Sequence, residues 1–154
     1  MAINVRTKGQ SGEREICKFF NDIYREVYAE LKIPFPNVEP CQRNQNQSAV
    51  GGCDVINTCY YAVEVKRQEQ LAINTWWAQC VESAIDLNKF PVLMYRQNGK
   101  KWKVVLYMNP IRLFANEARH IPEDPPRAEI SIEDFRAIFR AHAIEYIKRN
   151  GNTL

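Results

Sequence analysis

The chain has 154 residues and a mass of 18.0 kDa, with 45% hydrophobic and 25% charged residues, which fits one ordinary globular domain over residues 1–154. No apolar stretch approaches the roughly 20 residues of a membrane span, and no signal sequence is recognisable, so we expect a cytoplasmic protein that does not enter membranes. The net charge of +3 permits a nucleic-acid partner without arguing for one.

The cysteines favour free, mostly buried thiols, because they are odd in number and never spaced Cys-x-x-Cys. They are Cys17, Cys41, Cys53, Cys59 and Cys80. Zinc is the weaker alternative, since His120 and His142 are the only histidines.

A long amphipathic helix is predicted near the N-terminus. Residues 1–10 form a polar arm, Ser11 is a suitable N-cap, and apolar residues then follow helical spacing to a stop before Pro34. Glu13 falls in the first turn of this predicted helix, at the inward edge of its apolar face. Its carboxylate either interacts with the helix dipole or points at a site on the sheet.

A loop over residues 34–52 leads to a β-hairpin, with predicted strands over residues 53–56 and 60–66 around Asn57-Thr58. Alternation along the second strand places Tyr61, Val63 and Val65 on one face and Ala62, Glu64 and Lys66 on the other.

The charges of this hairpin predict a metal site. Asp54 on the first strand can reach the face that carries Glu64 and Lys66. Two converging carboxylates repel each other unless a cation or a proton lies between them. Oxygen ligands suit Mg²⁺ or Mn²⁺, and an adjacent lysine can hold or deprotonate a water molecule. The alternative is the solvated face of an edge strand, where charges on strands are commonly found.

A second helix is predicted over residues 72–88, followed by strands over residues 91–95 and 101–107 around the hairpin turn Asn98-Gly99. Trp76 and Trp77 lie about 100° apart on a helix, so we expect one in the core and the other at a subunit interface, with stacking on DNA as the alternative for the second.

The C-terminal third is predicted to hold a short helix from Pro110 to Phe114, a connecting segment over residues 117–130, and a last helix. Ser131 is its expected N-cap, the end falls near Arg149, and its apolar residues are expected to pack onto the domain.

Two motifs carry a resemblance to known nucleases. Asp54, nine intervening residues and then Glu64-Val65-Lys66 resemble the bipartite motif of the PD-(D/E)xK nuclease superfamily, with Cys53 in place of the usual proline. The segment from Lys8 to Glu15 resembles the opening motif of archaeal-type and phage Holliday junction resolvases. The resemblance covers roughly residues 6–108 and leaves a C-terminal helical extension of about residues 110–150.

The resemblance implies an α/β fold with a restriction-endonuclease-like core, a mixed β-sheet flanked by helices. It also implies a Mg²⁺-dependent DNA endonuclease, with Mn²⁺ as a substitute, that resolves branched four-way DNA as a homodimer. The implied catalytic residues are Glu13, Asp54, Glu64 and Lys66, and the implied metal ligands are Asp54, Glu64, the Val65 carbonyl and Glu13. The implied DNA contacts are Arg6, Lys8, Arg14, Arg43, Ser48 and Arg67, with Gln79 behind the site.

Two alternatives remain open from the sequence. The first is a repair, restriction or single-strand-specific nuclease of the same fold. The second is a non-catalytic DNA-binding protein on the same scaffold.

Overall fold

The computed structural model describes residues 5–45, 52–108 and 126–154. The helices are α1 (Val5–Leu31), α2 (Ile73–Leu87) and α4 (Ile132–Arg149). The strands are β1 (Gln42–Arg43), β2 (Val55–Ile56), β3 (Tyr61–Arg67), β4 (Phe90–Arg96), β5 (Lys103–Tyr107) and β6 (Arg127–Ser131). None of these helices is long and apolar enough to cross a membrane.

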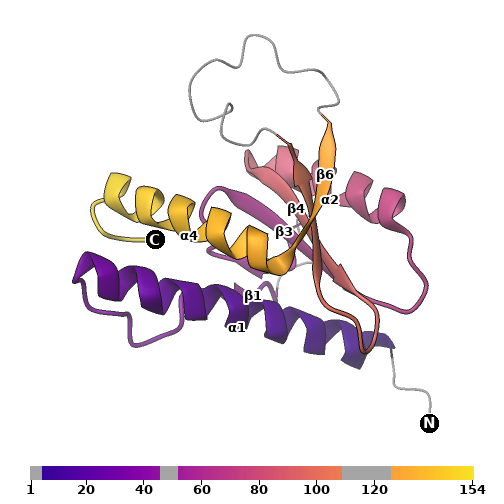
Figure 1. Cartoon of the computed structure of the whole chain (residues 1–154), viewed down its shortest axis with the longest axis horizontal. Helices are drawn as coiled ribbons and strands as arrows, with labels where there is room; N and C mark the ends of the chain where they lie inside the picture. Colours follow the sequence, from indigo (N-terminus) through magenta and orange to yellow (C-terminus); the bar gives the residue numbers. More distant parts are fainter. Residues whose placement is uncertain (1–4, 46–51, 109–125) are drawn as a thin grey trace.

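The six strands form one mixed sheet whose spatial order follows the sequence, β1 to β6. Only β3 and β4 are parallel, and α2 provides the crossover that a parallel pair requires. Figure 1 shows α1 and α4 on one side of the sheet and α2 on the other. This arrangement confirms the predicted α/β class with a mixed sheet flanked by helices.

Both faces of β3 are buried, but against different partners. Tyr61, Val63 and Val65 pack into the large core with α1 and α4, where Phe20 and Phe139 meet edge to face at 4.6 Å between ring centroids. The opposite face of the sheet packs against α2. The alternation predicted for this strand is therefore present in the structure.

The prediction that one of the two adjacent tryptophans is exposed is wrong. Trp76 and Trp77 are each only 6% exposed, and they pack toward Tyr95 and Tyr107 with ring centroids 6.2 and 5.2 Å apart. A helix on a broad sheet can bury two residues that straddle its line of contact, even when they point about 100° apart. The pair therefore gives no support for a subunit interface.

The predicted start of the first helix is also wrong, because α1 begins at Val5 rather than after Ser11. The Ser11 hydroxyl accepts a hydrogen bond from Arg67 Nη1 at 2.9 Å instead of capping a helix. Glu13 consequently lies in the third turn, away from the partial positive charge of the helix N-terminus. The helix dipole therefore does not explain the position of Glu13.

Part of the predicted connecting segment is a strand, since β6 pairs with β5 from Arg127 to Ser131. Ser131 then caps α4 as predicted, accepting a hydrogen bond from the Asp134 amide at 3.0 Å. Phe135 and Phe139 of α4 are completely buried in the large core, so the helix packs onto the domain as expected. The predicted short helix from Pro110 to Phe114 lies outside the described residues.

α1 packs closely against β3 at Gly12. Of the glycines in the described residues, Gly12 has the least space for a side chain. A Cβ atom at this position would lie 3.2 Å from Arg67 Cβ and 3.3 Å from the Trp102 ring. Neither neighbour is the free end of a flexible chain, so a larger residue would push the helix away from the strand. Gly12 therefore determines how close its neighbour Glu13 comes to the sheet.

We expect Gly12→Ala to destabilise the fold by about 1–2 kcal/mol, because crowding exceeds the helix propensity that alanine adds. Gly9→Ala is the matched control on the same helix, since a Cβ atom there meets nothing within 4 Å. The control should gain about 0.5–1 kcal/mol. Urea unfolding measures both, and equal stabilisation by the two substitutions would contradict close packing at Gly12.

Candidate active site

Hydrogen bonds to β3 hold Asp54, the residue that precedes β2, at the candidate site. β2 has two residues and β3 has seven, so the edge of β3 extends beyond its partner. The Asp54 amide donates to Val63 O at 3.0 Å, and its carboxylate accepts from the Val65 amide at 2.6 Å. The Asp54 side chain therefore takes a backbone donor on β3 beside Glu64 and Lys66.

Asp54 is a buried acid in a negative environment. Asp54 is only 8% exposed. Burial raises the pKa of its carboxyl to about 7, and the negative charge of Glu64 contributes to the increase. The Val65 amide and Lys66 act in the opposite direction. At neutral pH this carboxyl thus holds a proton in part of the molecules, or accepts a cation in its place.

Lys66 forms an ion pair with Glu64, with 2.6 Å between Nζ and Oε1. Burial by itself would lower the pKa of Lys66, but the charges of Glu64 and Asp54 outweigh it and raise that pKa. Lys66 is consequently an ammonium group near neutral pH. It acts as a hydrogen-bond donor and a positive charge rather than as a base.

Glu13 reaches the same end of the hairpin from α1. Its carboxylate lies 2.5 Å from Arg43 Nε on β1, and the two side chains are only 12% and 27% exposed. Its negative charge makes a small contribution to the raised pKa of Asp54. The charges of Glu13 on α1 and of Glu64 on β3 therefore both act on the carboxyl of Asp54, the residue that precedes β2.

Within the described residues, no three His, Cys, Asp or Glu side chains converge closely enough to form a metal centre. The ion pairs explain this, because Glu13 is directed toward Arg43 and Glu64 toward Lys66. The donor chemistry nevertheless fits a hard cation, since carboxylate oxygens are the preferred ligands of Mg²⁺ and Mn²⁺.

The residues predicted to contact DNA differ in their surroundings. Arg14 is exposed and lines a surface hollow of about 400 Å³ together with Arg43. Arg67 is held by Ser11 and Glu15, and Lys8 forms an ion pair with Glu69. The side chain of Arg6 and all of Ser48 lie outside the described residues.

Gln79, predicted to lie behind the site, is exposed on α2. Its neighbour Cys80 is the residue that faces β3, with its sulfur 3.8 Å from the Ala62 carbonyl. Burial, together with the negative charge of Glu64, raises the pKa of the Cys80 thiol.

Glu15 is an organising residue that the sequence analysis did not identify. Its carboxylate accepts hydrogen bonds from Arg67 at 2.8 Å, Arg96 at 2.9 Å and the Trp102 indole at 3.1 Å. It thereby attaches α1 to β3, to β4 and to Trp102, the residue that precedes β5. These partners lie 52 to 87 residues away in the sequence, so no local pattern could reveal them.

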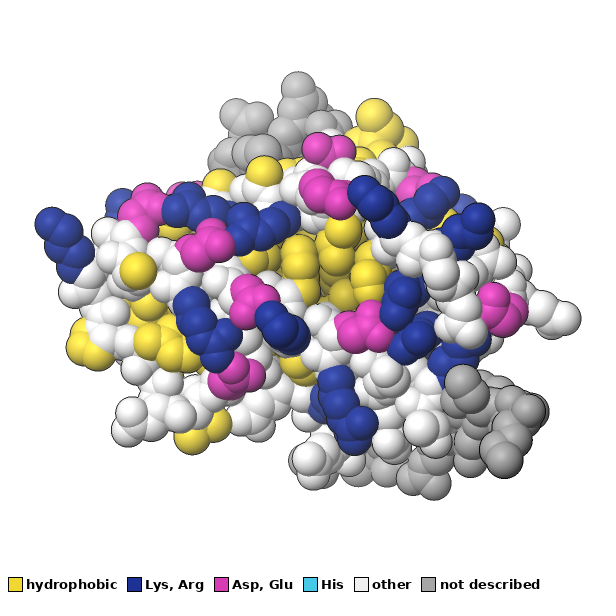
Figure 2. All heavy atoms as spheres, turned by 60° about the horizontal axis from the view of Figure 1, so that its bottom comes forward, with side chains coloured by type: hydrophobic (Ala, Val, Ile, Leu, Met, Phe, Trp, Pro, Cys, Tyr) yellow, Lys and Arg dark blue, Asp and Glu magenta, His cyan; other side chains and the backbone are white. Residues whose placement is uncertain are grey.

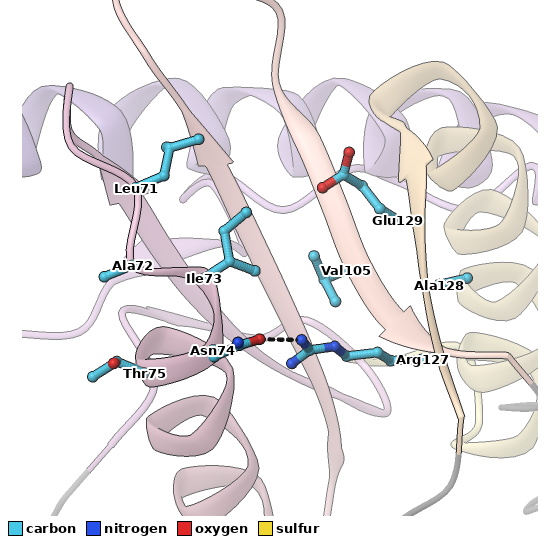
Figure 3. Close-up of a pocket in the computed structure, with 9 residues that line it drawn as sticks. All are labelled: Leu71, Ala72, Ile73, Asn74, Thr75, Val105, Arg127, Ala128 and Glu129. Carbon is cyan, nitrogen blue, oxygen red and sulfur yellow. Dashed lines mark hydrogen bonds between the residues drawn. The ribbon is translucent and has the colours of Figure 1, made fainter.

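A second hollow, of about 550 Å³, lies between the start of α2 and strands β5 and β6. Figure 3 shows Arg127 crossing it to hydrogen-bond Asn74, with Ile73 and Val105 on its walls. None of Glu13, Asp54, Glu64 and Lys66 lines this hollow, so it is separate from the candidate site.

Lysine and arginine side chains are interspersed with carboxylates around an apolar patch on the face shown in Figure 2. Many of the molecule's charges are paired, as in the contact between Arg140 of α4 and Glu26 of α1 at 3.7 Å. A nucleic acid would therefore meet local groups of cations rather than a uniformly basic surface.

Comparison with known proteins places this geometry in context. A family model described as "Phage putative PDDEXK endonuclease" matches residues 4–147, which confirms the resemblance predicted from the motifs. The chain is also similar to the solved structure of Hjc, a Holliday junction resolvase from the archaeal hyperthermophile Archaeoglobus fulgidus. That match has 14% identity and a TM-score of 0.40, and it covers 82% of this chain and 85% of the other. The curated proteins contain no match to this chain.

We expect Asp54→Asn to stabilise the metal-free fold at pH 8 by about 2–4 kcal/mol. The pKa of about 7 in the folded state lies above the ordinary value of 3.8, so burying the charge costs stability once the pH rises through this range. At pH 4 the carboxyl is protonated in the folded state and only about half protonated in the unfolded state, so the gain should fall to below about 1 kcal/mol.

Urea unfolding with a chelator at pH 4, 6 and 8 tests this expectation. Glu82→Gln, on the exposed face of α2, is the control and should change stability by less than about 0.5 kcal/mol at every pH. A gain for Asp54→Asn that is independent of pH would contradict a buried charge at this position.

Proposed function

Because this chain belongs to the family of phage PD-(D/E)xK endonucleases, we propose that it is a metal-dependent DNA endonuclease that acts on branched DNA. Its proposed substrate is the four-way junction, cut in the cytoplasm of a prokaryotic or phage-infected cell. The observation that carries the proposal is the burial of the Asp54 carboxyl next to Glu64. The pKa of Asp54 is raised to about 7, and a cation beside it would stabilise its charged form.

The proposed ligands of the ion are Asp54, Glu64, the Val65 carbonyl and Glu13, with Mg²⁺ as the natural ion and Mn²⁺ as a substitute. When bound, such a cation supplies Lewis-acid chemistry to a phosphoryl oxygen and acidifies a water molecule. The positive charge of the bound cation would also offset the repulsion between the carboxylates of Asp54 and Glu64.

Lys66 has the proposed role of orienting the attacking water. Its ammonium group lies 2.6 Å from Glu64 and therefore has a defined position on β3. Its donated hydrogen bonds hold a water in line with the phosphorus, and its charge stabilises the negative charge that develops on the phosphate oxygens.

Arg14 and Arg43 are the proposed phosphate contacts nearest to the acids, because both line the hollow beside Glu13. Lys8 and Arg67 would exchange their present carboxylate partners, Glu69 and Glu15, for phosphate. Arg6 and Ser48 complete the proposed set. Phosphate contacts of this kind position the DNA and weaken with salt.

A homodimer is the proposed assembly. A four-way junction requires two symmetric cuts, and a two-fold dimer presents two equivalent sites. Neither the dimer nor the junction preference rests on the buried tryptophans of α2.

We expect Lys66→Ala to abolish cleavage of a four-way junction while junction affinity stays within about tenfold, or 1.4 kcal/mol. The assay uses four-way, flap and linear duplex DNA, each with Mg²⁺ and with chelator, and a separate binding measurement in chelator. Lys100→Ala, an exposed lysine in the β4–β5 turn, is the control and should cut normally. A loss of affinity equal to the loss of activity would make Lys66 a phosphate contact only.

Glu13→Gln should cut at least about a hundredfold more slowly, which corresponds to a barrier increase of about 2.7 kcal/mol. Removing its charge takes away one proposed ligand and releases Arg43, while the fold should remain stable. Glu30→Gln on the same helix is the control, since that carboxylate pairs with Arg140 at the far end. Full activity of Glu13→Gln would restrict the site to the hairpin.

A further inference from the structure

One stripe of α1 pairs with the segment that enters β1. Four residues of a helix rise about 6.0 Å, close to the roughly 6.6 Å spanned by two residues of a strand. Every fourth residue of α1 can therefore lie opposite every second residue of an extended segment beside it. Three such pairs occur in antiparallel order: Glu13 with Arg43, Cys17 with Cys41, and Asn21 with Glu39. The two cysteines form the middle pair.

Asn21 holds the backbone of Cys41 in place. Its amide nitrogen donates to the Cys41 carbonyl at 2.9 Å, and its amide oxygen accepts from the Cys41 amide at 2.8 Å. Asn21 is buried and lies one helical turn beyond Cys17 on the same face. The side chains of Glu39, Cys41 and Arg43 alternate onto the side of the chain that faces α1, so the Cys41 thiol lies toward Cys17. The interaction between the two thiols lowers the pKa of Cys17 and raises that of Cys41.

The other three cysteines have different partners. Cys53 donates to the Val55 carbonyl at 3.0 Å, Cys59 lies 3.3 Å from the Tyr24 hydroxyl, and Cys80 faces the Ala62 carbonyl. All five are free thiols in the described part of the chain. The position of Cys17 opposite Cys41, between the contacts of Glu13 with Arg43 and of Asn21 with Glu39, thus distinguishes these two cysteines from the rest.

Only one thiol of the pair lines a surface hollow. Cys17 belongs to the wall of the 400 Å³ hollow and is 9% exposed, whereas Cys41 does not line the hollow and is 2% exposed. The same wall carries Arg14, Lys18, Arg43 and the acid Glu39, and of these cations Lys18 is paired with Asp22 and Arg43 with Glu13. A small anionic reagent is therefore attracted to the hollow and meets Cys17 first.

We propose that Cys17 and Cys41 form a redox-active dithiol, a modification site that takes a small anionic disulfide as its oxidant and closes into an intramolecular disulfide. The Cys17 thiolate attacks one sulfur of the reagent, whose sulfur–sulfur bond breaks and releases one thiolate. Cys41 then loses its proton to solvent and attacks the Cys17 sulfur, which releases the second thiolate. Two electrons pass to the reagent, and the two protein protons balance the two released thiolates.

The crosslink would lie next to the ion pair of Glu13 and Arg43, four residues along α1 from Glu13 and two residues along the chain from Arg43. It would fix β1 on α1 and keep Arg43 against the Glu13 carboxylate. If the proposed function holds, on which this consequence rests, oxidation slows DNA cleavage because Glu13 is not released.

Oxidised glutathione is the test reagent for the full-length protein. Thiol titration and peptide mapping under non-reducing conditions should show the loss of two thiols and a Cys17–Cys41 linked peptide, reversed by dithiothreitol. Cys41→Ser should stop at a mixed disulfide of Cys17 with glutathione, and Cys53→Ser, the control, should form the same link as the native chain. A link that uses other cysteines, or a mixed disulfide that persists on Cys17 of the native chain, would overturn the proposal.

Cleavage assays separate the site from its consequence. The oxidised native chain should cut at least about tenfold more slowly and recover with dithiothreitol, while Cys17→Ser should be unaffected by the reagent. Unchanged cleavage by the crosslinked chain would overturn the regulatory consequence. Absence of cleavage by the fully reduced chain would instead contradict the proposed function, and the mapped disulfide would still stand.

Discussion

The close approach of α1 to β3 at Gly12 determines where the charged groups of this molecule lie. A glycine lets the helix rest on Arg67 and Trp102, and Glu15 then bonds to both of those residues and to Arg96. The next turn of the same helix presents Cys17 to Cys41. One short contact therefore positions the acid that faces the hairpin, the carboxylate that secures the helix, and the thiol pair.

The candidate site is a balance of three acids and two cations. Glu13 and Glu64 each have a cation within 2.6 Å, and Asp54 has a backbone amide at the same distance. Such an arrangement leaves negative charge uncompensated in a partly buried place, which costs stability and favours the uptake of a cation. The cost of burying Asp54 and its proposed role as a ligand thus have the same physical origin.

The proposed metal site and the proposed dithiol share one residue, Arg43. Arg43 belongs both to the ion pair with Glu13 and to the wall of the hollow that Cys17 lines. A change in the cysteine pair therefore acts on the segment that carries this arginine. The coupling is short, because Cys41 and Arg43 are two residues apart at the entrance to β1.

Local patterns in the sequence determined the hairpin of Asp54, Glu64 and Lys66, the α2 helix and the Ser131 cap, because side-chain alternation, helical spacing and capping act over a few residues. The tertiary structure decided what depends on distant partners. It placed Ser11 against Arg67 inside a longer helix, buried both tryptophans on a broad sheet, and added β6 to the edge through pairing with β5. It also joined Glu13 to Arg43 and Cys17 to Cys41, since each pair forms only when α1 is packed against the sheet edge.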